Sequence, residues 1–241
     1  MKGLRVEFYS LTASFRDPNT HLYQETMPAP PPTTIAGIVG AAFGIEYREV
    51  LDYFKKNVIS VGCMIEFKGE GKDLWNYSKI KGKQVVKDIL IREFLSDVNI
   101  SLYFACENLG VVEELYRAFQ DPCFAITLGN SDDLAIIKDV QIFENIKTVY
   151  SKSVKNTWLN GNYMDKFELD WERIKSLPIK LTIKPPVIKK LPVDFKFNKN
   201  QERESNKLNT FTFLGELHLL KEPVETYRFD KQFIPMYTFK H

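Results

Sequence analysis

Aromatic and basic side chains alternate within residues 75–83 of this chain. Trp75 and Tyr77 precede Lys79, Lys81 and Lys83, so in an extended segment all five side chains project from one face. Rings on which bases stack, next to ammonium groups that pair with phosphates, are the features with which proteins hold single-stranded nucleic acid. The alternative is a hairpin whose aromatic rings only cover its own base.

A second candidate contact, Phe15 with Arg16, is expected in a loop beside Asp17. An arginine in such a loop can pair with a phosphate, and the neighbouring ring can stack on a base. Alternatively, Phe15 belongs to the core and Arg16 pairs with Asp17. The tryptophans Trp158 and Trp171 have no basic neighbours and are expected in the core.

Residues suited to catalysis or metal binding are sparse. The histidines His21, His218 and His241 are far apart, and no cysteine or histidine pair has the spacing of metal ligands. Phosphate-binding glycine loops and the serine nucleophile elbow are absent from the sequence. The acidic residues between 165 and 172 indicate an exposed loop. The sequence therefore predicts no catalysis, no metal site and no cofactor.

Residues 28–44, PAPPPTTIAGIVGAAFG, predict an extended segment that enters a helix. Proline restricts φ, so the run that ends at Pro32 holds the backbone extended, and Thr33 or Thr34 can cap the helix. Apolar residues recur at helical spacing from Ile35 to Phe43 and predict a buried stripe.

The opposite face of this helix carries Gly37, Gly40, Ala41 and Gly44. A face without long side chains suits close approach by another backbone, from the same chain, a protein partner or a nucleic acid. Tight packing inside the domain is the structural alternative.

The order of expected elements predicts an α+β fold. Strands are expected at about 4–11, 57–67, 98–106 and 134–143, and helices at 33–44, 47–56 and 109–120. The main order is βαββαβ, the ferredoxin-like unit that RNA-recognition domains also use. We therefore expect a ferredoxin-like domain over 1–143 with a β-hairpin inserted at about 68–96. Residues 144–241 are expected to form a smaller β-rich part, either a subdomain or strands added to the first sheet.

Composition describes an ordinary globular chain. Of 241 residues, 44% are hydrophobic and 27% charged, and the net charge is +2. The charge is segregated, because lysines concentrate at 79–92 and 175–199, which suits a phosphate-binding surface or a solvated one. Three widely separated cysteines and the lack of an apolar leader indicate a cytoplasmic protein with reduced thiols.

Four segments, in this order, resemble the CRISPR-associated Cas-five family. They are residues 14–18 (SFRDP), 30–37 (PPPTTIAG, entering the glycine-spaced helix), 92–95 (REFL) and 128–131 (LGNS). In the last segment, Asn130 stands where the family usually has arginine. The resemblance covers about residues 1–143.

This resemblance implies a RAMP domain in a type I Cascade antiviral surveillance complex. Such a subunit holds the 5′ handle of the CRISPR RNA, caps the filament of backbone subunits and contacts the large subunit, and through the complex it meets target DNA. The hairpin would be a thumb that kinks the RNA. The RNA contacts expected from the residues and the resemblance together are Phe15, Arg16, Pro32, Thr33, Thr34, Gly37, Gly40, Trp75, Tyr77, Lys79, Lys81, Lys83 and Arg92.

Two other hypotheses stay open. One branch of the family is a metal-independent ribonuclease that cuts precursor RNA with a tyrosine and a lysine–histidine pair. In this sequence the adjacent pair is Lys240-His241, at the far end, and His21 has no evident partner, so we expect no cleavage. Without the resemblance, the chain would be a cytoplasmic protein-interaction domain whose glycine face docks a helix.

Overall fold

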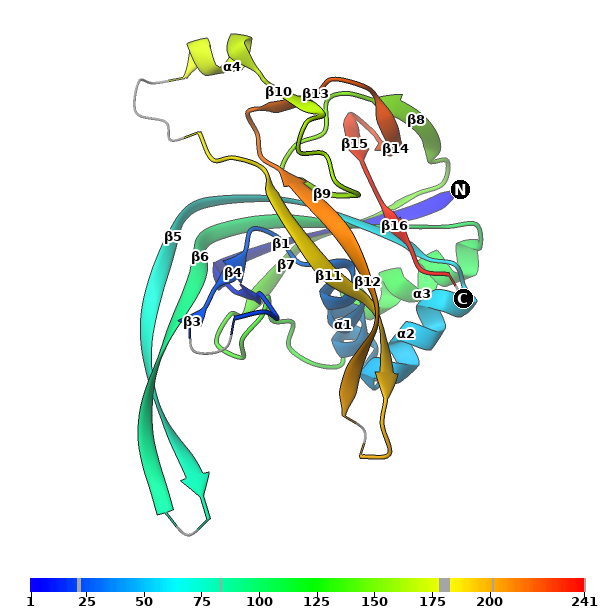
Figure 1. Cartoon of the computed structure of the whole chain (residues 1–241). Helices are drawn as coiled ribbons and strands as arrows, with labels where there is room; N and C mark the ends of the chain where they lie inside the picture. Colours follow the sequence, from blue (N-terminus) through cyan, green and yellow to red (C-terminus); the bar gives the residue numbers. More distant parts are fainter. Residues whose placement is uncertain (21–22, 83, 178–182, 201, 241) are drawn as a thin grey trace.

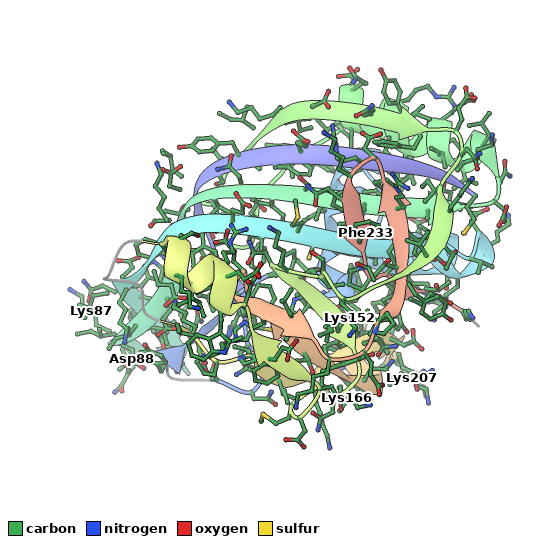
Figure 2. All side chains as sticks on the ribbon, turned by 90° about the horizontal axis from the view of Figure 1, so that it is seen from above. Lys87, Asp88, Lys152, Lys166, Lys207 and Phe233 are labelled. Carbon is green, nitrogen blue, oxygen red and sulfur yellow. The ribbon has the colours of Figure 1, made fainter. Side chains whose placement is uncertain are left out.

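A long, mostly antiparallel sheet runs through the molecule (Figure 1). The structure is a computed structural model that describes residues 1–20, 23–82, 84–177, 183–200 and 202–240. Seen from above, the four long strands lie side by side (Figure 2). The strand order is β16 (Tyr237–Thr238), β5 (Ser60–Lys81), β6 (Gln84–Cys106), β1 (Lys2–Ala13) and β7 (Ala135–Phe143), with β3 (Tyr23–Gln24) beside β6.

Three helices cover one face of this sheet: α1 (Pro32–Phe43), α2 (Tyr47–Lys56) and α3 (Leu109–Gln120). Alternate residues of β1, including Leu4, Val6 and Phe8, are fully buried beneath them. The apolar stripe of α1 packs into the same core, where Ile35 is 1% exposed. The expected α+β class, these helices and the four strands are confirmed.

The start of α1 differs from the prediction. The helix begins at Pro32, its N-cap residue is Pro31, and no side chain caps it. Proline is favoured in the first turn because its missing N–H would have no helical partner there. Thr33 and Thr34 are therefore helical residues, and the prediction that either one caps the helix was wrong.

Helix α2 covers the glycine face of α1. A Cβ atom added at Gly40 would lie 3.3 Å from Val50 Cγ1, and one added at Gly37 would lie 3.4 Å from the Tyr47 ring. Gly44 ends the helix with φ of 72°, a left-handed conformation that glycine adopts without strain. Packing within the same chain, the structural alternative, therefore describes this face at Gly40, whereas Gly37 is partly exposed.

The expected hairpin insertion is present and is continuous with the two central strands. Pairing of β5 with β6 runs from Ser60 opposite Ala105 to Lys81 opposite Gln84. We call residues 68–96 the thumb, because this ribbon extends away from the body (Figure 1). Gly82, with φ of 61°, lies in its turn.

The C-terminal residues build further small sheets and also complete the first one. Trp158, Phe211 and Phe239 join the same buried cluster as β1 and the helices, whereas Trp171 is 60% exposed, so its expected core position was wrong. The remaining elements are β2 (Phe15–Arg16), β4 (Thr26–Met27), β8 (Lys147–Ser151), β9 (Thr157–Asn160), β10 (Phe167–Leu169), α4 (Trp171–Ser176), β11 (Val187–Phe197), β12 (Arg203–Leu214), β13 (His218–Leu220), β14 (Val224–Phe229) and β15 (Gln232–Ile234).

Strands β11 and β12 form a second long hairpin that pairs with β9. In the view of Figure 1 it extends to the same side of the body as the thumb. The division of the chain at residue 143 stays a prediction. In the described part of the chain, no helix has the length and apolarity needed to span a bilayer.

Candidate nucleic-acid interface

One face of the thumb carries a ladder of aromatic and charged side chains. Asp73, Trp75, Tyr77 and Lys79 alternate onto this face from β5, and Arg92 of β6 pairs opposite Asp73. The Trp75 and Tyr77 rings stack with centroids 5.8 Å apart, and Lys79 Nζ lies 5.5 Å from the centre of the Tyr77 ring. Trp75 is nevertheless 46% exposed, so part of its ring is accessible to a base.

Arg92 is held inside this ladder. Its guanidinium lies 4.8 Å from the Trp75 ring centre and donates hydrogen bonds to Asp73 (2.7 Å) and Asp132 (3.3 Å). The hydrogen bond to Asp73 is the main reason that the pKa of Arg92 lies above its ordinary value. The arrangement therefore assigns Arg92 to orienting Trp75 and tying the thumb to the loop at Asp132.

The predicted lysines of the thumb differ in how far the structure describes them. Lys79 lies 3.7 Å from Asp88, whose carboxylate also accepts a hydrogen bond of 3.1 Å from the Tyr77 hydroxyl. Lys81 is the last residue of β5, and Lys83 lies outside the described residues. Lys87 and Asp88, in the outer half of the thumb, lie at one edge of the molecule (Figure 2).

The opposite face of the thumb is aliphatic and open to solvent. Leu74, Ile80, Val85 and Ile89 are each at least 60% exposed. They alternate with the aromatic ladder along β5 and β6. The sequence analysis missed this face, although the alternation of apolar residues within 85–91 is its signal.

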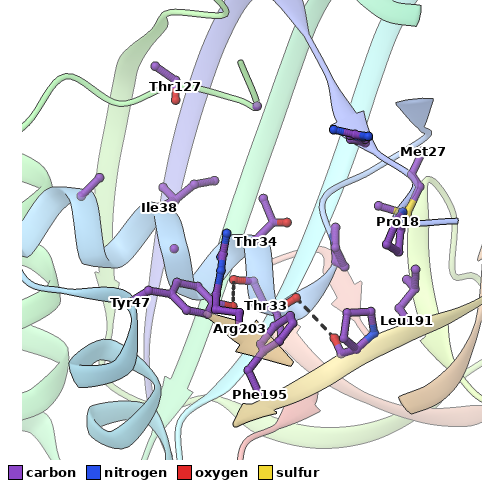
Figure 3. Close-up of a pocket in the computed structure, with 16 residues that line it drawn as sticks. Pro18, Met27, Thr33, Thr34, Ile38, Tyr47, Thr127, Leu191, Phe195 and Arg203 are labelled. Carbon is purple, nitrogen blue, oxygen red and sulfur yellow. Dashed lines mark hydrogen bonds between the residues drawn. The ribbon is translucent and has the colours of Figure 1, made fainter. Parts of the chain in front are cut away.

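A cleft of 340 Å³ lies where α1 begins, between α2 and the β11–β12 hairpin (Figure 3). It brings together four of the predicted contacts, Arg16, Thr33, Thr34 and Gly37, and we call it the cleft. Arg16 is exposed, and its guanidinium donates a hydrogen bond to the Thr20 carbonyl at 3.3 Å.

The wall beside Thr33 is held by two hydrogen bonds to segments distant in sequence (Figure 3). The Thr33 hydroxyl donates to the Pro192 carbonyl (3.3 Å), and the Tyr47 hydroxyl donates to the Thr33 carbonyl (3.0 Å). Burial raises the pKa of Tyr47 to about 12, so this phenol stays protonated at neutral pH. These contacts fix the β11–β12 hairpin against α1 and α2.

Arg203 supplies a second cation to the cleft. Its guanidinium lies 5.0 Å from the centre of the Tyr47 ring and 5.9 Å from that of Phe195 (Figure 3). Arg203 is exposed at the start of β12. Among the described residues, no carboxylate forms an ion pair with it. Arg16 and Arg203 together give the cleft a positive character that suits phosphate.

Sequence reasoning missed Tyr47, Phe195 and Arg203. The lysine-rich stretch 175–199 pointed to the right hairpin, but one of its lysines is committed elsewhere: Lys189 pairs with the buried Asp17 at 2.6 Å. Arg203 itself lies just outside that stretch, and nothing in its local sequence connects it with Tyr47.

Three predicted contacts lie in packed positions instead. Phe15 is 2% exposed and belongs to the core, so its ring is not accessible to a base. The alternative that Phe15 belongs to the core is confirmed. The expected pairing of Arg16 with Asp17 was wrong, because Asp17 pairs with Lys189. Pro32 and Gly40 are buried at the start of α1 and beneath Val50. His21 lies outside the described residues.

The LGNS turn at residues 128–131 positions the loop that carries Arg16. Ser14 N–H donates to the Leu128 carbonyl at 2.9 Å. A Cβ atom at Gly129 would lie 1.8 Å from the Ser14 carbonyl oxygen, and φ there is 130°, so the position requires glycine. Asp133 holds the turn by accepting hydrogen bonds from the Asn130 N–H (3.0 Å) and the Thr12 hydroxyl (2.6 Å).

The comparison with known families agrees with this architecture. A family model described as "CRISPR-associated protein (Cas_Cas5)" matches residues 3–204. The chain belongs to the Cas-five family of CRISPR-associated proteins. A search of curated proteins gave no match.

Within the residues that the structure describes, no group of three or more histidine, cysteine or acidic side chains could hold a metal ion.

A comparison with solved structures shows a similar fold over the whole chain in one case. A CRISPR protein from Archaeoglobus fulgidus matches with a TM-score of 0.55 and 13% identity, over 99% of this chain and 100% of that one. A chain of a CRISPR RNA-guided surveillance complex gives 0.43 and 12%, over 53% of this chain and 57% of its own length. A chain of a type III-B Cmr-beta complex bound to cognate target RNA and AMPPnP gives 0.44 and 11%, over 92% and 86%.

Proposed function

We propose that this Cas-five protein is a non-catalytic subunit of a type I Cascade surveillance complex that holds the 5′ handle of the CRISPR RNA. The observation that carries the proposal is the Trp75–Tyr77 stack with Lys79, displayed on a ribbon that extends from the body. Stacking of a base on an aromatic side chain contributes about 1–3 kcal/mol and accepts any base. A thumb of this kind suits a strand that must be held along its backbone.

The cleft supports the same proposal with different chemistry. Arg16 and Arg203 line a hollow that Thr34 also lines, so a phosphate there can receive charge-assisted hydrogen bonds. The thumb would hold bases while the cleft holds the backbone. Sequence would then be read by base pairing in the complex, and protein would hold the guide by its shape.

We further propose that residues 1–143 form a ferredoxin-like RAMP domain. The order β7-β1-β6-β5, with α1 and α3 on one face, supports this arrangement. In the complex the subunit would cap the filament of backbone subunits and contact the large subunit. The exposed aliphatic face of the thumb is available for such protein contacts.

The protein would hold RNA without cutting it. Among the described residues that line the cleft, none has an imidazole or a carboxylate to act as a general base. The Tyr47 hydroxyl is engaged as a donor to Thr33 and is held protonated by its raised pKa. Metal-independent cleavage of a matching repeat RNA by the purified protein would contradict this part.

The test is to purify the protein from its native host under gentle conditions and to sequence the bound RNA. We expect short RNAs that share one 5′ end, together with co-purifying partner subunits. Absence of RNA, or a random sample of transcripts, would contradict the proposal and favour the protein-interaction hypothesis.

A further inference from the structure

A second cavity, with a volume of 390 Å³, lies at the root of the thumb, and none of the predicted RNA contacts lines it. Its walls come from Phe67 and Glu70 of β5, from residues 25–28, and from β11 and residues 213–218. Small-molecule and cofactor sites have volumes of about 300–1,000 Å³. We call this second cavity the root cavity. Met27 lines both the root cavity and the cleft, so the two hollows are adjacent.

The charged groups around the root cavity already have partners. The pairs are Glu70 with Lys184, Glu25 and Asp17 with Lys189, and Glu216 with Arg173. Each ammonium or guanidinium group in these pairs is neutralised by a carboxylate. The root cavity therefore lacks the spare positive charge that a phosphate needs, which distinguishes it from the cleft.

The polar group that lacks a partner is a histidine. His218 is 4% exposed, and its Nδ1 atom lies near the Gly215 backbone but makes no well-formed hydrogen bond with the described residues. Burial lowers the pKa of His218, so at neutral pH the ring is uncharged, with one nitrogen as donor and the other as acceptor. Asn156, which also lines the root cavity, adds an amide donor and acceptor.

The remaining walls are largely apolar and include two aromatic rings, Phe67 and Phe213. An aliphatic protein side chain would fit these walls but would leave the imidazole and the amide unpaired, which is unfavourable in a buried site. A nucleobase has a flat face for the rings and an edge with both donors and acceptors. It matches the apolar and the uncharged polar parts of the lining, and the charged groups there already pair with one another or with Arg173.

We propose that the root cavity receives one unstacked nucleobase of the bound RNA, with His218 and Asn156 facing its hydrogen-bonding edge. The inference rests on the proposed RNA-holding function and adds base selectivity at one nucleotide. The base would belong to the same strand whose backbone lies in the cleft, because Met27 borders both hollows.

The test measures the affinity of the full chain for A, C and U oligoribonucleotides of equal length, and for an abasic oligomer, by fluorescence anisotropy. We expect the affinities for the best and the worst base to differ by about tenfold. This is the effect expected from one hydrogen-bonded or stacked base. His218→Leu removes the unpaired nitrogen and should reduce this range to about twofold or less. Trp75→Ala is the control, because it should weaken all base-containing oligomers together and preserve their ranking.

Gly215→Leu is the second variant, in case His218→Leu perturbs folding. A Cβ atom at Gly215 meets its nearest neighbour, His218 Nδ1, at 3.7 Å, so a side chain there enters without backbone strain and fills the space. Gly215→Leu should reduce the range of affinities among the bases to about twofold or less, as His218→Leu should. An unchanged preference in both variants, or equal binding of all bases by the unaltered chain, would overturn the root-cavity inference alone. Failure of the unaltered chain to bind any oligomer would instead contradict the proposed function.

Discussion

The thumb and the cleft, the two regions that we propose hold RNA, are built in different ways. The thumb is a two-stranded ribbon whose functional side chains are two residues apart in one strand, and solvent surrounds both its faces. The cleft is walled by residues from β2, α1, α2 and the β11–β12 hairpin, which meet only after the body has folded. A change in the thumb should therefore affect binding alone, whereas a change beside the cleft can affect both binding and stability.

The largest expected effect is on stability, beside the cleft. Gly40→Leu places a side chain against Val50 and the Ile45 carbonyl, where a Cβ atom already lies 3.3–3.4 Å away, so it should lower the free energy of unfolding by about 1–3 kcal/mol. Gly82→Asn in the thumb turn is the control, because a Cβ atom there meets nothing within 4 Å and asparagine tolerates positive φ. Urea denaturation measures both. Equal stability of the two variants would contradict the contrast between the regions.

The next effect is on binding by the thumb. Trp75→Ala should weaken binding of single-stranded RNA by about 5- to 100-fold, which corresponds to the loss of one stacked base, and should leave the unfolding free energy unchanged. Leu74→Ala, on the opposite face, is the matched control. Anisotropy titrations measure the RNA affinity of both variants. If Leu74→Ala were equally damaging, the aliphatic face would be the RNA surface.

In the cleft, Arg203→Ala should weaken RNA binding by about tenfold, because it removes the guanidinium that would donate a charge-assisted hydrogen bond to a phosphate. Lys207→Ala removes a cation from the same strand, but Lys207 does not line the cleft, so its effect should be under about twofold. Similar affinities for the two variants would show that the hairpin acts through its net charge and not through the cleft.

A smaller effect is expected on the dependence of RNA affinity on salt concentration. Replacing Lys79, Lys81 and Lys83 together by alanine should reduce the slope of log affinity against log salt by about 0.7 for each phosphate that these lysines neutralise. The measurement is a titration at several salt concentrations. An unchanged slope would mean that the thumb acts by stacking alone, and phosphate binding would then belong to the cleft.

The smallest effect is a dependence of stability on pH. Burial tends to raise the pKa of Asp17, but hydrogen bonds from Lys189 and Asn19 outweigh it, and the pKa lies below its ordinary value. A carboxylate with a lowered pKa in the folded state stabilises the fold at higher pH and loses that contribution as pH falls through the folded pKa. Asp17→Asn should therefore flatten the decline in unfolding free energy below the ordinary aspartate pKa of 3.8. An unaltered decline would assign it to other carboxylates.

The parts of the molecule that depend on local order in the chain were predictable. Helices α2 and α3 were predicted with their observed bounds, and the alternation along 75–83 predicted that Trp75 and Tyr77 lie on one face. The cleft could be predicted only in part. Arg16, Thr33 and Thr34 belong to motifs, but Arg203 reaches Tyr47 through packing across the whole fold, which no local pattern encodes. The exposed Trp171 shows the same limit, because the apolar character of a residue does not establish its burial.

Strand β16 has a consequence for the order in which this protein acquires its shape. Tyr237 pairs with Val61, Phe239 N–H donates to the Ile59 carbonyl at 3.1 Å, and the Phe239 ring contacts Phe54. During synthesis, the edge of β5 and the Phe54 ring of α2 remain uncovered until residues 237–239 leave the ribosome. The helices and the thumb can form before residues 237–239 are synthesised, but this edge of the sheet can close only after those residues are present. Until then, the nascent chain presents an unpaired strand that favours binding to chaperones or mispairing with other chains.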